Sequence, residues 1–181
     1  MTYEEAYLYM KEAGKRGSVY GTETVKELLL RLGNPQDRVP VVHIAGTNGK
    51  GSIFAFVGHI LEDAGYVAGR YISPTIFTYL ERFQINGHYM KESEFARIME
   101  TVIPVCEDME EAGLPIPTAF ELETAVAFLY FVQKKVDIVL LETGMGGILD
   151  VTNVTEHPLV SVITALYRAC KHQQRSYAVS W

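Results

Sequence analysis

The feature that most constrains the fold is a short apolar run, VPVVHIA at residues 39–45, which is followed at once by the glycine-rich GTNGKGS. The run is β-branched and has no polar alternation, so it predicts a buried strand. Apolar residues then recur at helical spacing from Ile53 to Leu61, and Gly65 ends the predicted helix. Residues 66–72 predict a second strand. A strand, loop, helix, strand unit is typical of parallel sheets with right-handed crossovers.

The segments around this unit predict four further helices. Thr2 with Glu5 forms a capping box for a first helix that ends near Gly14, and a second helix closes at Gly33. Ser93 is expected to cap a long helix that runs to about Gly113. A second capping box, formed by Thr118 and Glu121, predicts a helix that ends near Lys135.

The remaining segments complete an α/β pattern. Asn86-Gly87 predicts a small β-hairpin, the run VDIVLLE at 136–142 predicts a central buried strand, and LVSVIT at 159–164 predicts another buried strand. The expected fold is therefore an α/β, P-loop-containing, three-layer domain with a mostly parallel sheet and a small β-hairpin insertion. Ligand sites in such folds lie at the carboxyl ends of the strands.

Composition narrows the function classes. A length of 181 residues suits one well-buried core. The net charge of −6 argues against nucleic acid as a partner, because phosphate contacts need clustered Lys and Arg. The N-terminus is acidic and lacks the features of a signal peptide, and no apolar run is long enough to span a bilayer. We expect a cytoplasmic protein without a membrane partner.

The glycine-rich loop is a candidate phosphate cradle. Backbone N–H groups of such a loop converge on phosphate oxygens at a helix N-terminus, while a lysine serves the terminal phosphate. The spacing differs from G-x-x-x-x-G-K-[ST], since Gly46 precedes Gly49 by three residues and Gly51 separates Lys50 from Ser52. The alternative is a tight turn with no ligand. Lys50 favours the anion, because a cation at a helix start opposes the helix dipole.

Glu142 is the second candidate. It ends the predicted central strand, so its carboxylate should emerge beside the glycine loop. An unpaired carboxylate there is costly, and Mg²⁺ on an ATP phosphate would satisfy it. The alternative is a carboxylate that caps the following TGMGG turn.

Four motifs together carry a family resemblance. HIAGTNGKGS, SPTIFTYLERFQING, TAFE and LLETGMGGILDVTN, in this order, resemble folylpolyglutamate synthase and dihydrofolate synthase, members of the Mur ligase superfamily. The resemblance covers residues 2–164, including GSVYGTETVKELLLRLGNP.

The resemblance implies three groups of site residues. The ATP phosphates would lie against the loop, formed by Gly46, Thr47, Asn48, Gly49, Lys50, Gly51 and Ser52. Ser73 and Glu142 would be Mg²⁺ ligands; for Ser73 the alternative is an ordinary loop serine. The pterin-bearing substrate would lie near Thr118, Ala119, Phe120, Glu121, Leu149, Asp150 and Val151. For Thr118 and Glu121 the capping box is also a complete structural explanation.

The resemblance also implies the chemistry. Family members use ATP and Mg²⁺ to join a folate or dihydropteroate carboxylate to L-glutamate. The ATP terminal phosphate first forms an acyl phosphate, and the glutamate amine then expels phosphate. The task is one of alignment and charge neutralisation, so no protein nucleophile is required and no residue is assigned as catalytic. The family is typically monomeric.

The chain departs from the family after Thr164. Residues 165–181 contain three basic residues and no acidic ones, and they lack the family's Asp-His turn. We therefore expect residues 1–164 to form an incomplete Mur-ligase-type ATP-binding domain, residues 165–181 to be an aberrant tail, and the C-terminal glutamate-binding domain to be absent. Two alternatives to a ligase stay open: a catalytically inactive nucleotide-binding fragment and a generic P-loop kinase.

Overall fold

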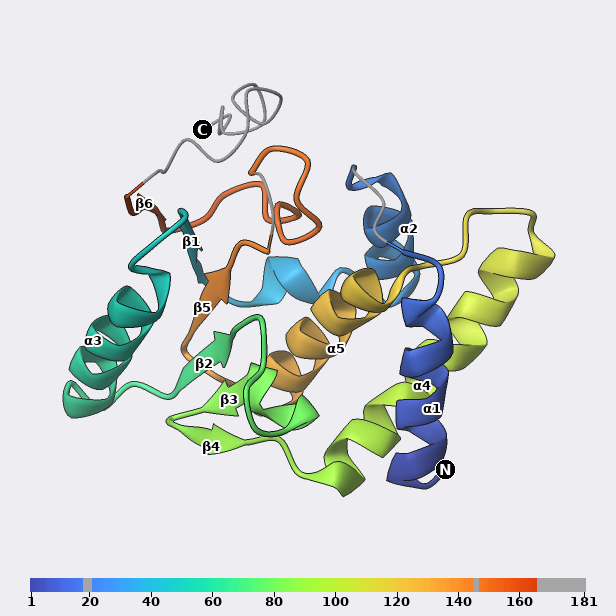
Figure 1. Cartoon of the computed structure of the whole chain (residues 1–181), viewed down its shortest axis with the longest axis horizontal. Coiled ribbons are helices and arrows are strands. Elements are labelled where there is room, and N and C mark those ends of the chain that lie inside the picture. The colour runs from blue at the N-terminus through green and yellow to red at the C-terminus, as the bar shows by residue number, and fades with distance from the viewer. Residues whose placement is uncertain (18–20, 145–146, 166–181) are drawn as a thin grey trace.

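The computed structural model describes residues 1–17, 21–144 and 147–165. A six-stranded sheet with the order β4-β3-β2-β5-β1-β6 lies at its centre, with helices packed against it (Figure 1). The residues after Ala165, where the sequence predicted an aberrant tail, lie outside the described residues.

Four parallel strands form the main part of the sheet. They are β1 (Val41–Ala45), β2 (Ala68–Tyr71), β5 (Ile138–Glu142) and β6 (Val160–Ile163). Strand β5 lies between β1 and β2 and pairs with both. The hairpin of β3 (Phe83–Ile85) and β4 (His88–Tyr89) adds to β2 in antiparallel fashion, around the predicted Asn86-Gly87 turn. The predicted mostly parallel sheet with a hairpin is confirmed.

The helices cover the two faces of the sheet unequally. On one face lie α1 (Tyr3–Gly14), α2 (Glu23–Arg31), α4 (Glu92–Glu111) and α5 (Ala119–Gln133), and on the other lies α3 (Lys50–Asp63). Short 3₁₀ helices span Pro35–Arg38 (η1) and Tyr79–Arg82 (η2). Along β5, Val139 and Leu141 pack in the larger core and Leu140 packs toward α3, as strand alternation requires. The result is the predicted three-layer arrangement.

One helix start differs from its prediction. Ser93 was expected to cap α4, but that helix begins at Glu92, with Lys91 at the N-cap position. The Lys91 backbone N–H donates to the Glu94 carboxylate at 3.0 Å. An acid three residues after the N-cap thus satisfies the first donor, which leaves Ser93 inside the first turn.

The strand predicted at 159–164 is present, but the prediction that it is buried is wrong. Strand β6 pairs with β1 and is the outer strand on that side of the described sheet. Val160 and Ile163 are exposed, as is Leu159 just before the strand. A β-branched apolar run indicates strand structure, but its burial depends on what packs against it.

Among the helices that the structure describes, none combines the length and the apolar composition that crossing a bilayer demands.

Candidate functional site

The glycine loop connects the end of β1 to the start of α3. Gly49 has a left-handed backbone, with φ of 89°. Gly46 has φ of 139°, and a Cβ atom there would lie 1.9 Å from Thr164 Oγ1. Gly51 is different, because a Cβ atom added there would meet nothing within 4 Å. The first two glycines are therefore required by the fold, whereas Gly51 borders open space at the start of α3.

Backbone hydrogen bonds connect the loop to Ala165, two residues after β6 ends. The N–H groups of Thr47 and Asn48 donate to the Ala165 carbonyl at 3.0 and 3.3 Å. The N–H groups at the start of α3 have no acceptor within their own helix, and they carry the positive end of its dipole. Lys50, Gly51 and Ser52 thus present backbone N–H groups without an intrahelical acceptor, whereas those of Thr47 and Asn48 donate to Ala165.

Lys50 reaches back over the loop toward β5. Its Nζ donates to the Gly46 carbonyl at 2.8 Å and lies 3.6 Å from Glu142 Oε1. Glu142 ends β5 and pairs in register with Ile44 of β1, so adjacent parallel strands bring the two charges together. This is the position at the carboxyl edge that the sequence predicted for Glu142.

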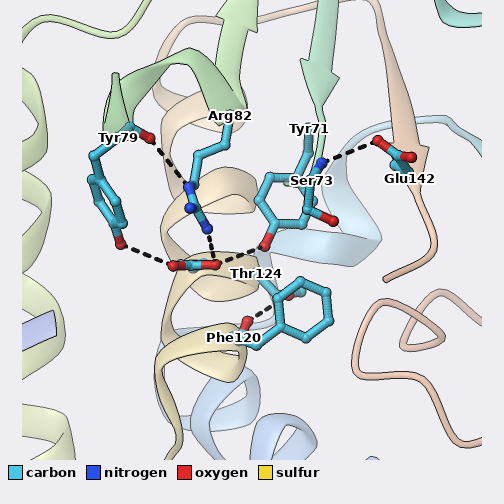
Figure 2. Close-up of polar contacts among 8 residues, drawn as sticks. Tyr71, Ser73, Tyr79, Arg82, Phe120, Thr124 and Glu142 are labelled. Carbon is cyan, nitrogen blue, oxygen red and sulfur yellow. Dashed lines mark hydrogen bonds and ion pairs between the residues drawn. The ribbon is translucent and has the colours of Figure 1, made fainter. Parts of the chain in front are cut away.

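The Glu142 carboxylate is largely buried. Its Oε2 accepts a hydrogen bond from the Ser73 backbone N–H at 3.0 Å (Figure 2). Burial raises the pKa of Glu142, and the Ser73 N–H and Lys50 oppose that rise. The alternative, in which Glu142 caps the following turn, has no supporting contact within the described residues; Met145 and Gly146 lie outside them. The structure therefore brings both predicted Mg²⁺ ligands, Ser73 and Glu142, together.

These residues fit Mg²⁺ as an ion shared with a phosphate. Mg²⁺ prefers carboxylate, hydroxyl and phosphate oxygens, and proteins often hold it through one or two carboxylates and the phosphates of a substrate. Within the described ranges, no group of three or more His, Cys, Asp and Glu side chains is gathered in a way that could hold a metal. Glu142 and Ser73 together offer one carboxylate and one hydroxyl, a small donor set that suits an ion arriving with its nucleotide.

Glu81 fixes the loop that follows Ser73. Its carboxylate accepts hydrogen bonds from the backbone N–H groups of Phe77 at 2.8 Å and Thr78 at 3.1 Å, and also from Ile76. These donors lower the pKa of Glu81. The side chains of Ile76 and Phe77 are left exposed at the loop tip. The segment that carries Ser73 is thus held by a buried carboxylate.

The predicted substrate residues of α5 lie beside the end of β5. Glu121 accepts two hydrogen bonds from Thr118, through its N–H and its hydroxyl, both at 2.8 Å. Both side chains are buried, so helix capping accounts for them. Ala119 begins the helix, and Phe120 packs over Gly144, where a Cβ atom would lie 2.4 Å from the ring.

The second predicted substrate segment is mostly buried as well. Leu149 is half-exposed, whereas Asp150 and Val151 are buried. The Leu149 carbonyl accepts a hydrogen bond from the Gly21 N–H at 3.2 Å, and Asp150 Oδ1 accepts from the Thr152 N–H at 2.9 Å and from its hydroxyl. This segment and the start of α5 both lie toward the carboxyl end of the parallel strands.

A buried ionic cluster was missed from the sequence. Glu123 on α5 forms an ion pair with Arg82 and accepts hydrogen bonds from the hydroxyls of Tyr79 at 3.1 Å and Tyr71 at 3.5 Å (Figure 2). The cluster therefore connects α5 to β2 and η2, the two elements between which the Ser73 loop runs. The available signal was Glu123 itself, a second carboxylate, beyond the capping Glu121, in the mostly apolar helix AFELETAVAFLYF. The contacts of the His43 ring with the hydroxyls of Thr143 and Thr152 were missed as well.

No family model matches the chain, but individual proteins and solved structures of one kind do. The chain is 41% identical over 165 residues to a dihydrofolate synthase/folylpolyglutamate synthase of Bacillus subtilis, covering 91% of this chain and 38% of the relative. The crystal structure of a folylpolyglutamate synthase from Thermotoga maritima superposes with a TM-score of 0.84 at 41% identity, over 92% of this chain and 38% of that one.

A third comparison concerns ligands. A structure described as an FPGS-AMPPCP-folate complex superposes with a TM-score of 0.78 at 34% identity, over 90% of this chain and 40% of that one. In all three comparisons the chain spans about two fifths of the length of the protein it matches.

Proposed function

We propose, because this chain is homologous to the N-terminal part of the folylpolyglutamate and dihydrofolate synthases, that it carries the ATP-binding site of a ligase of this kind. The reaction would join a folate or dihydropteroate carboxylate to L-glutamate through an acyl phosphate. The observation that carries the proposal is the meeting of the glycine loop, Lys50, Glu142 and Ser73 at one edge of the sheet.

The glycine loop is proposed to hold the ATP phosphates. Gly51 leaves open space where a phosphate would approach, and the start of α3 supplies backbone donors. Lys50 is already placed above the loop, so its ammonium needs only to exchange the Gly46 carbonyl for a phosphate oxygen. Charge-assisted contacts of this kind are stronger than those between neutral groups.

Glu142 and Ser73 are proposed to hold Mg²⁺ that arrives with the nucleotide. Bound there, the ion would neutralise phosphate charge as the terminal phosphate passes to the substrate carboxylate. The protein contributes a buried carboxylate whose only described cationic neighbour, Lys50, lies 3.6 Å away. Burial that disfavours its charge in the free protein makes a cation favourable at this place.

The pterin-bearing substrate is proposed to lie near the start of α5 and the segment 149–151. Support comes from the placement of both toward the carboxyl end of the strands and from the related complex described as containing folate and AMPPCP together. Phe120 and the half-exposed Leu149 offer apolar surface. L-glutamate would complete the reaction, and the fold is proposed to act as a cytoplasmic monomer.

A second candidate function is nucleotide binding without turnover. What favours it is that the described site has groups assigned to the nucleotide, at the glycine loop, Lys50 and Glu142, whereas no described residue is assigned to L-glutamate. Ligation requires that L-glutamate be aligned as well, since the acyl phosphate must meet the amine before water does.

One incubation separates the candidates. The purified chain is mixed with ATP, Mg²⁺, dihydropteroate and L-glutamate, and ADP and the glutamylated product are followed by chromatography. Equal amounts of ADP and product support the ligase. Nucleotide binding without ADP release supports the second candidate, and a phosphorylated product that accumulates in the presence of glutamate would instead indicate a kinase.

A further inference from the structure

His43 lies where β1, β5 and the segment after Gly147 meet. It is the third residue of β1, in register with Leu141 of β5 and Ser161 of β6. Its Nε2 lies 2.9 Å from the Thr143 hydroxyl and 2.9 Å from the Thr152 hydroxyl. The imidazole therefore contacts residues that directly follow Glu142 and closely follow Asp150.

The hydrogen-bond directions follow from counting protons. The Thr152 hydroxyl has a single proton, which it donates to Asp150 Oδ1. Its contact with His43 must then be one in which Nε2–H donates and Thr152 Oγ1 accepts. Thr143 Oγ1, which lies 2.9 Å from the same Nε2, is a second acceptor for that one proton. Burial lowers the pKa of His43, with Asp150 opposing, and a neutral ring with its proton on Nε2 makes this bond. A continuous chain thus runs from His43 through Thr152 to the Asp150 carboxylate.

The position does not call for a histidine on packing grounds. Val41, two residues earlier and on the same face of β1, belongs to the apolar core, and an apolar side chain at position 43 would continue it. Instead, His43 borders a small cavity of about 10 Å³, lined also by Thr143 and Asn153, which is room for about one water. The hydroxyls of Thr143 and Thr152 both contact the His43 ring, beside the proposed substrate segment.

We propose that His43 is a positioning residue that holds the Asp150 carboxylate in place for the pterin-bearing substrate, acting through Thr152. The proposal rests on the function proposed above, in which the segment 149–151 contacts that substrate. His43 Nε2 contacts Thr152, which donates to Asp150, and it also contacts Thr143, the residue after Glu142. It therefore connects the substrate segment to the strand that bears the nucleotide site.

Two substitutions at position 43 separate a positioning role from simple packing. His43→Phe keeps the ring shape and removes the donor, whereas His43→Gln places an amide N–H close to where Nε2–H was and keeps the bond to Thr152. His88→Gln, on the exposed strand β4, is the matched control. Each variant and the parent chain are titrated with dihydropteroate and, separately, with AMPPCP, and amide hydrogen exchange is followed over 147–153.

The expected result has two parts. His43→Phe weakens dihydropteroate binding about tenfold, the effect of one lost hydrogen bond on a positioned group, and leaves AMPPCP binding within about twofold. It also speeds exchange over 147–153, including the Thr152 amide that donates to Asp150. His43→Gln and His88→Gln retain the parent values.

Each contrary outcome has a separate meaning. Unchanged exchange over 147–153 in His43→Phe overturns the proposal, as does parent-like dihydropteroate binding in that variant. Equal losses in His43→Phe and His43→Gln also overturn it, because packing rather than the donor would then matter. If the parent chain binds AMPPCP but no dihydropteroate, the proposed substrate is wrong and the substrate role of His43 falls with it, while the exchange data still decide whether His43 orders the segment.

Discussion

Lys50 and Glu142 lie 3.6 Å apart at the ends of two different elements, one at the start of α3 and the other at the end of β5. Neither charge is optimally placed without a ligand: the lysine opposes the dipole of its helix, and the carboxylate is mostly buried. A magnesium nucleotide would resolve both conflicts, with its phosphates meeting the lysine and its metal meeting the carboxylate.

Lys50→Gln should weaken nucleotide binding without unfolding the chain. The Gln amide can still donate to the Gly46 carbonyl, but the charge-assisted phosphate contact is lost. Such contacts contribute roughly 1.5–3 kcal/mol, or about 10- to 150-fold in the dissociation constant for AMPPCP. Calorimetric titration measures this dissociation constant in the variant and the parent. Lys15→Gln, a change of a well-exposed lysine, is the control and should bind normally.

Glu142→Gln should stabilise the ligand-free chain at neutral pH. Because the folded-state pKa of Glu142 lies above its ordinary value of 4.5, the folded protein retains a proton that the unfolded chain has lost, and stability falls as pH rises through that window. The variant does not titrate there. Its free energy of unfolding, measured in urea, should exceed that of the parent at pH 8 and converge with it near pH 4.

A matched change on the surface tests the interpretation. Glu110→Gln, at an exposed position of α4, is the control for the exchange of a glutamate for a glutamine. If Glu142→Gln shows the same pH dependence as the parent, the carboxylate is not destabilised by burial.

Removing one partner of the Glu123–Arg82 ion pair should destabilise the fold more than replacing both partners. Glu123→Ala leaves a buried guanidinium without its carboxylate, and the expected loss is about 3–5 kcal/mol of unfolding free energy. Replacing both partners, as Glu123→Leu with Arg82→Met, should recover much of it. Urea denaturation of the single and double variants measures the coupling, and a double variant no more stable than Glu123→Ala would contradict the assignment.

Two glycines of the loop should respond in opposite ways. Gly46→Ala forces a side chain to adopt φ of 139° and to clash with Thr164, at a cost of about 1–3 kcal/mol. Gly51→Ala lies in α3 with open space around it and should stabilise the fold by roughly 0.5–1 kcal/mol. Its new methyl group fills the proposed phosphate space, so AMPPCP binding should weaken. A stable Gly51→Ala with parent-like affinity would place the phosphates elsewhere.

Local patterns predicted the elements well, because their signals are contained in a few neighbouring residues. Thr2 with Glu5 caps α1 as expected, and Asn86-Gly87 turns the hairpin. The order of the strands could not be predicted in the same way. The sequence indicated parallel strands but not that β5 would lie between β1 and β2. That order is what brings Glu142 beside Lys50.

The parts that the sequence did not predict depend on long-range partners. Glu123 pairs with Arg82, 41 positions away in the sequence, and His43 contacts Thr152, 109 positions away. The exposure of β6 likewise depends on which element lies beyond it, as Val160 and Ile163 have the composition of a buried strand. Ser93 failed as a cap because Glu94 already satisfied the N-cap donor.

The most direct test of the account is a calorimetric titration of AMPPCP into the chain with and without Mg²⁺, repeated with Glu142→Gln. We expect one site per chain, at least tenfold tighter binding with Mg²⁺, and loss of that gain in the variant, because the carboxylate is the proposed protein ligand of the ion. Absence of binding to the parent chain, or a gain from Mg²⁺ that is the same in both proteins, would contradict the claim that the glycine loop and Glu142 form one magnesium-nucleotide site.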